Sequence, residues 1–103
     1  MNIRITSRKF KAKQSLKDFI KEEIRSLEKF EDRILDANVV LSFTHSKDSI
    51  KSAEIVLSLP GKIISVTESS DDFEKSASIA VQKIRKQISK LKTKRIIRKK
   101  NED

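Results

Sequence analysis

The residues in this sequence best suited to chemistry are lysines and arginines in its last quarter. At 100° per residue on a helix, four of them fall within a stripe about 80° wide: Lys83, Lys86, Lys90 and Lys94. Arg85 and Lys92 lie together on the other side of the apolar face of the same predicted helix. Ammonium and guanidinium groups attract phosphate, so this spacing predicts a surface that binds a polyanion.

The net charge of the chain arises in the same segment. Residues 1–74 contain 13 Lys and Arg and 13 Asp and Glu, whereas residues 75–101 contain 11 Lys and Arg and no acid. The formal net charge of +9 therefore comes from the last quarter. A helix face that is merely solvated usually mixes acids with bases. RNA or another polyanion explains this pattern better than solubility does.

The aromatic residues indicate how RNA would be recognised. The chain has no Trp or Tyr, and four of its five Phe lie on apolar stripes: Phe19, Phe30, Phe43 and Phe73. The predicted sheet therefore lacks the exposed aromatic side chains on which single-stranded bases stack. Lysine supplies point charges rather than paired hydrogen bonds to base edges. We expect recognition through phosphates and RNA shape, not through base sequence.

Catalytic and metal-binding chemistry have few candidates. His45 is the only histidine and there is no cysteine, so a metal site would lack further ligands of these types. Gly61, the only glycine, cannot by itself form a phosphate-cradling loop. We expect no enzymatic activity, cofactor, metal or small-molecule substrate, and we interpret His45 as a partly exposed strand residue.

The sequence also indicates in which cellular compartment the protein is found. No apolar run approaches the roughly 18 to 20 residues that a membrane helix needs. The basic helix lacks Trp and has two alanines on its apolar face, which argues against membrane-surface binding. The absence of cysteine fits a reducing compartment. We expect a cytoplasmic protein without a membrane partner.

Alternating apolar residues predict four strands, at residues 2–6, 37–43, 53–59 and 64–66. A helical apolar repeat predicts a first helix over residues 15–31, with Ser15 and Asp18 resembling a capping box. The second helix is expected to begin near Ser69 or Ser70 as a cap and to run to about Lys94. Pro60-Gly61 suits a type II turn, in a loop expected to extend a residue or two further.

The predicted order β-α-β-β-β-α indicates the α+β class, with two helices packed on one face of a four-stranded mixed sheet. The first two strands should pair in parallel through a right-handed crossover. The other face of the sheet should be polar, with Arg4, Thr6, Ser42, Thr44 and Ser58. Residues 1–95 are predicted to form one domain and residues 96–103 a short, basic, frayed tail.

Three stretches resemble one family in order and spacing. Residues 1–8, MNIRITSR, look like an opening strand that ends in an I-x-I-T-G-R-type motif, with Ser7 where Gly is common. Residues 16–34 look like the family's first helix and its exit, and residues 83–92, KIRKQISKLK, look like its K-L-x-x-Q-L-x-K-x-K motif. The chain thereby resembles the ribosome hibernation factors, that is, the short hibernation-promoting factor and ribosome-associated inhibitor family, also called the sigma-54 modulation protein family.

The resemblance implies a fold similar to a double-stranded RNA-binding domain. It also implies binding to the small ribosomal subunit and its rRNA, in the decoding channel, in competition with mRNA and tRNA. Such a protein would reversibly block translation under stress or in stationary phase. By matched position the rRNA contacts would be Lys83, Arg85, Lys86, Lys90, Lys92 and Lys94, with Arg8, Lys17, Lys21, Arg25, Lys29 and Arg33.

Two departures from the family pattern limit this transfer. Family members often have lysine in the middle of the first helix, where this chain has Glu22-Glu23. The family's acidic start of the second helix is here Asp72-Phe73-Glu74-Lys75-Ser76-Ala77, so its acid contacts are not transferred. The main alternative is a general module for double-stranded or structured RNA, without ribosome specificity. A protein-interaction module, as the name sigma-54 modulation suggests, is a third hypothesis.

Overall fold

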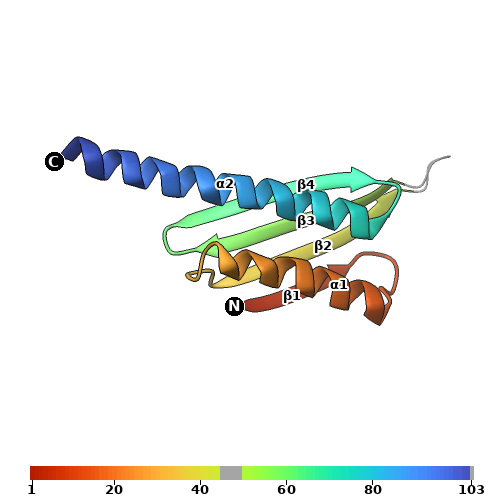
Figure 1. The fold of residues 1–103 in the computed structure, drawn as a ribbon. Coiled ribbons are helices and arrows are strands. Elements are labelled where there is room, and N and C mark those ends of the chain that lie inside the picture. Colours follow the sequence, from red (N-terminus) through yellow and green to blue (C-terminus); the bar gives the residue numbers. More distant parts are fainter. Residues whose placement is uncertain (45–49, 103) are drawn as a thin grey trace.

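The structure is a computed structural model that describes residues 1–44 and 50–102, with side chains described for residues 1–43 and 50–92. Its elements are β1 (Asn2–Ser7), α1 (Gln14–Arg25), the 3-10 turn η1 (Ser26–Lys29), β2 (Asp36–Thr44), β3 (Ile50–Leu59), β4 (Lys62–Ser70) and α2 (Phe73–Glu102). The predicted order β-α-β-β-β-α and the α+β class are confirmed (Figure 1). The separation of residues 96–103 as a frayed tail stays a prediction.

The four strands form one sheet in the order β1-β2-β3-β4. β1 pairs with β2 in parallel, and the two later pairs are antiparallel, as expected for a mixed sheet. Leu59 pairs with Lys62, so the turn between β3 and β4 consists of Pro60 and Gly61 and is shorter than predicted. Gly61 has φ +74°, a left-handed conformation that glycine adopts without steric cost.

Both helices cover the same face of the sheet and begin at the same end of it (Figure 1). α2 packs on β3 and β4, and α1 packs beside α2. The predicted apolar stripe of α2 is buried, including Ala77, Ala80, Val81, Ile84 and Ile88. It forms one core with inward-facing strand residues such as Ile55, Leu57 and Ile64. In the part of the chain that the structure describes, none of the helices is long and apolar enough to span a membrane.

The start and end of α1 differ from the prediction. Lys13 precedes the helix and no side chain caps it, so the capping box predicted at Ser15 is wrong. Gln14 Nε2 instead donates a hydrogen bond of 2.9 Å to Asp18 Oδ1. The predicted helix over residues 15–31 is an α-helix only to Arg25, and the chain then tightens into η1. A 3-10 turn is a common way for an α-helix to end.

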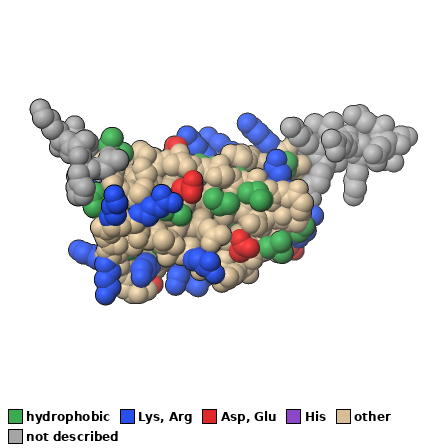
Figure 2. Space-filling model, turned by 180° about the vertical axis from the view of Figure 1, so that it is seen from behind, with side chains coloured by type: hydrophobic (Ala, Val, Ile, Leu, Met, Phe, Trp, Pro, Cys, Tyr) green, Lys and Arg blue, Asp and Glu red, His purple; other side chains and the backbone are tan. Residues whose placement is uncertain are grey.

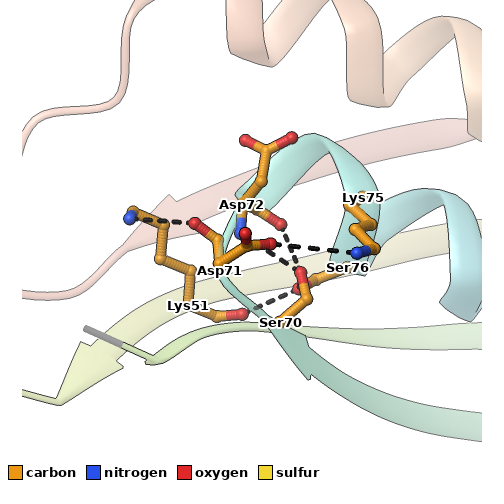
Figure 3. Close-up of polar contacts among 6 residues, drawn as sticks. All are labelled: Lys51, Ser70, Asp71, Asp72, Lys75 and Ser76. Atoms are coloured by element: carbon orange, nitrogen blue, oxygen red, sulfur yellow. Dashed lines mark hydrogen bonds and ion pairs between the residues drawn. The ribbon is translucent and has the colours of Figure 1, made fainter. Parts of the chain in front are cut away.

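A buried serine connects α2 to the sheet (Figure 3). Ser76 is fully buried, and its hydroxyl donates a 2.7 Å hydrogen bond to the Lys51 carbonyl on β3. Ser76 Oγ also lies 2.7 Å from Ser70 Oγ at the end of β4. Ser70 Oγ accepts a 3.2 Å hydrogen bond from the Asp72 N–H. α2 begins at Phe73, later than predicted, and Ser70 stabilises the turn that precedes it.

The opposite face of the sheet is largely uncharged. Arg4 and Thr6 are exposed there as predicted, and Ser42 and Ser58 are half-buried. The side chain of Thr44 is not among those that the structure describes. Figure 2 shows this side of the molecule, where hydrophobic, acidic and basic side chains are scattered over a mostly uncharged surface. One of the apolar residues is Ile63, which is 66% exposed.

We predict that Ser76→Ala destabilises the domain by about 1 to 3 kcal/mol, because it removes buried hydrogen bonds and leaves their partners without them. Urea denaturation followed by circular dichroism measures the change. Ser65→Ala changes an exposed serine of β4 and should stay within about 0.5 kcal/mol of the parent protein. Equal stability of the two variants would contradict a structural role for the Ser76 hydroxyl.

Candidate nucleic-acid interface

The cations of α2 extend along two sides of the helix, as its periodicity predicts. On the side toward β4, Lys83 Nζ lies 2.7 Å from Glu68 Oε1. On the side toward α1, the Arg85 guanidinium lies over the Phe30 ring, 4.7 Å from its centroid. Lys92, on the same side, has its Nζ 3.9 Å from Glu31 Oε2. Contacts on both sides therefore fix the rotation of the helix.

Lys86 and Lys90 lie on the surface between these two sides. Both are exposed, and neither takes part in an ion pair among the described residues. Their ammonium groups are therefore available to an external anion. Lys94, predicted to continue the stripe, lies outside the described side chains, and its role stays a prediction.

Glu31 is a buried carboxylate that the sequence analysis did not identify. Its side chain is 4% exposed, and Oε1 accepts a hydrogen bond from Arg33 Nε. This hydrogen bond, together with the charges of Arg33 and Lys92, lowers the pKa of Glu31 below the usual 4.5 although burial acts in the opposite direction. Arg33 and Lys92, both predicted RNA contacts, are thus partly neutralised within the protein.

Phe30 differs from its predicted position on the apolar stripe of the first helix. It follows η1 and is 38% exposed, whereas Leu27 within η1 is fully buried. Arg85 covers part of its ring. The partly exposed ring therefore lies among side chains that were predicted to bind phosphate.

The residues of the first helix that were predicted to contact rRNA differ in exposure. Lys17 and Lys21 are half-buried, whereas Arg25, Lys29 and Arg33 are exposed. The three exposed cations all lie at the C-terminal end of α1 or just beyond it. This end also carries Phe30, which contacts Arg85 of α2. The structure thus brings the exposed cations at the end of α1 close to Arg85 of α2.

Arg8 lies apart from this region, in the loop between β1 and α1. Its side chain is exposed, and its backbone N–H donates to the Leu41 carbonyl. Ser7 Oγ donates to the Phe10 carbonyl and closes the turn in which Lys9 has φ 64°. Phe10 anchors the loop by stacking on Phe73, with ring centroids 5.0 Å apart. The loop therefore holds Arg8 at the end of the sheet where both helices begin.

An acidic groove separates these two basic regions. It lies between α1 and the first turn of α2 and is lined by Ser15, Asp18, Phe19, Glu22, Glu23 and Glu74. Ser78 of α2 donates a 2.8 Å hydrogen bond to Glu23 Oε1 across it. Because these carboxylates repel phosphate, the C-terminal half of the helical layer suits a polyanion better by its charge.

Within residues 1–44 and 50–102, no group of three or more His, Cys, Asp or Glu is placed to hold a metal ion. His45, the histidine singled out in the sequence, lies outside the described residues.

Fold and surface together define an α+β domain with a basic helical face. The family model described as Sigma 54 modulation protein / S30EA ribosomal protein matches residues 3–96, and the chain belongs to this family. The resemblance to the ribosome hibernation factors is thereby confirmed. This is a family of ribosome-associated factors and not of enzymes.

Two solved structures share the fold. The N-terminal domain of Protein Y from Thermus thermophilus is 27% identical, with a TM-score of 0.78 over 88% of this chain and 99% of that one. A ribosomal subunit interface protein from Coxiella burnetii is 22% identical, with a TM-score of 0.80 over 90% of this chain and 99% of that one. The second likeness supports the fold alone.

We predict that the Glu31 ion pairs stabilise the domain at neutral pH and that this stabilisation is lost in acid. A carboxyl whose folded pKa is lowered stabilises the fold above its unfolded pKa of 4.5, and it ceases to do so as the pH falls through the folded value. Glu31→Gln should therefore cost about 1 kcal/mol at pH 7. The difference from the parent protein should shrink below pH 4.5.

Urea denaturation over a pH series measures this difference. Glu28→Gln, which alters an exposed carboxylate in η1, is the matched control and should stay within about 0.5 kcal/mol of the parent at pH 7. A difference for Glu31→Gln that persists unchanged in acid would contradict the ion-pair explanation.

Proposed function

We propose that this protein is a ribosome hibernation factor that binds the small ribosomal subunit in its decoding channel. It contacts rRNA phosphates there and excludes mRNA and the anticodon ends of tRNAs. Translation is blocked reversibly, under stress or in stationary phase, and no chemical step is needed because occupancy itself excludes the ligands. This activity implies a cytoplasmic location.

The observation that carries the proposal is the exposed basic surface of α2 in a chain of a ribosome-associated family. Lys86 and Lys90 present charge on a helix whose other side is fully packed on the sheet. The helix backbone is thereby ordered before binding, so binding orders only the lysine side chains.

The proposed phosphate contacts differ in strength. Lys86 and Lys90 make the main contributions, because no internal ion pair among the described residues competes for them. Lys83, Arg33 and Lys92 contribute less, because each is shared with Glu68 or Glu31. Arg85, Arg25 and Lys29 extend the surface toward α1, whereas Lys17, Lys21 and Arg8 lie outside its centre.

We predict that the protein co-sediments with small subunits in a one-to-one ratio and that excess mRNA with initiator tRNA displaces it. One site shared by the protein and by both ligands requires this competition. Rising salt should also release it, since phosphate contacts displace counterions. Binding that persists unchanged with mRNA and tRNA present would contradict channel occlusion. Equal affinity for small subunits and for a plain RNA duplex would favour a general RNA-binding module.

We predict that reversing Lys86 and Lys90 to glutamate weakens binding to small subunits by about tenfold or more, because two phosphate contacts become repulsive. Lys83 is left unchanged, because glutamate there would face Glu68 and disturb the packing of α2 on β4. The double variant should retain the parent's thermal stability, since both positions are exposed.

The matched control reverses Arg4 and Lys11, which changes the net charge equally at two exposed positions away from the C-terminal half of the helical layer. Sedimentation at fixed salt compares the two variants. Full occupancy by the Lys86 and Lys90 variant, or an equal loss in the control, would contradict a specific role for the surface of α2.

A further inference from the structure

We propose that Phe30 and Arg85 form a site on which an unpaired RNA base stacks. This inference deepens the proposed function, and it rests on it for the identity of the RNA. It adds a base contact to a surface that otherwise recognises phosphate. Stacking on a ring or on a guanidinium plane is a common way in which proteins hold unpaired RNA bases.

The exposure of Phe30 is the first observation. Phe30 is 38% exposed, whereas Phe73 is only 8% exposed. The rings of Phe10 and Phe43 pack against each other. Leaving an aromatic ring in water forgoes the favourable free energy of its burial. The ring of Phe30, which directly follows η1, is therefore accessible to an external base.

The position of Arg85 is the second observation. Its guanidinium carbon lies 4.7 Å from the centroid of the Phe30 ring, within the range of a cation–π contact. Its Nε is buried and has no hydrogen-bond partner among the described residues. Among the described residues no carboxylate forms an ion pair with Arg85, so its contact with the ring holds the guanidinium in place. The buried Nε is out of reach of a nucleotide, and a stacked base would instead contact the Phe30 ring and the plane of the guanidinium.

The neighbouring cations are the third observation. Lys29 precedes Phe30 in the chain and is exposed. Glu31, the residue after Phe30, forms ion pairs with Arg33 and Lys92, so these two cations also lie near Phe30. Phosphates on either side of a stacked nucleotide would therefore meet positive charge. An aromatic ring surrounded by cations is the arrangement by which proteins bind single-stranded segments.

A plain cation–π contact within the fold is the competing explanation. It predicts that Phe30 and Arg85 matter for stability and equally for every RNA. Stacking predicts a loss confined to RNA with an unpaired base. The two explanations therefore differ in RNA preference, which can be measured directly.

The experiment compares two RNA probes, a plain duplex and the same duplex with one bulged 2-aminopurine. The parent protein should bind the bulged RNA more tightly and quench the 2-aminopurine, whose fluorescence falls on stacking. Phe30→Leu should weaken binding to the bulged RNA by about fivefold or more and abolish the quenching. Its affinity for the plain duplex should stay within about twofold of the parent.

Three further variants sharpen the result. Phe30→Tyr keeps the ring and should keep the quenching. Arg85→Lys keeps the charge without the planar group, so it should reduce the quenching more than it reduces duplex binding. Phe19→Leu removes a part-buried ring beside the acidic groove and should change neither measurement. Thermal melting confirms that each variant is folded.

Unchanged quenching and bulged-RNA affinity in Phe30→Leu would overturn the stacking site, and so would equal losses for both probes. These results do not depend on the ribosome. If small subunits show no displacement by mRNA and tRNA while Phe30→Leu still loses the bulged RNA, the channel proposal fails and the stacking site stands. The reverse pattern rejects the stacking site alone.

Discussion

The burial of one apolar stripe of α2 against the sheet is the constraint on which the rest of the molecule depends. Ala77, Ala80 and Ile84 are fully buried, and their spacing of three and four residues leaves the other positions facing outward. Between Lys75 and Lys92 the charged outward positions are all basic. The same helical repeat therefore determines both how the core packs and where the positive charge lies.

Two carboxylates lie at the two edges of this basic surface of α2. Glu68 of β4 pairs with Lys83, and Glu31 pairs with Lys92, so each side of α2 is attached to its neighbour. A buried carboxylate such as Glu31 needs cations close to it, since an unpaired charge in the interior is costly. Lys83 and Lys92 therefore contribute to the stability of the fold, whereas Lys86 and Lys90 have no ion pair among the described residues.

The sequence predicts periodic features well and long-range contacts poorly. The strands, the order of the elements, the parallel pairing of β1 with β2 and the buried stripe of α2 all follow from local apolar patterns, and they are confirmed. The end of α1 at Arg25 and the ion pair of Glu31 with Lys92 depend on how separate elements meet. No local pattern distinguishes Glu31 from an exposed glutamate, and none reveals that Phe30 leaves the core.

Acidic and basic side chains are unevenly distributed along the layer formed by α1 and α2. α2 carries Glu74 in its first turn, where the positive end of the helix dipole favours an acid. Arg25 lies in the last turn of α1, where the negative end of that dipole favours a cation. A polyanion that approaches this layer meets the carboxylates of the acidic groove and, beyond them, the exposed cations Arg25, Lys86 and Lys90. The electrostatic field therefore orients the polyanion before contact, which a uniformly basic domain would not do.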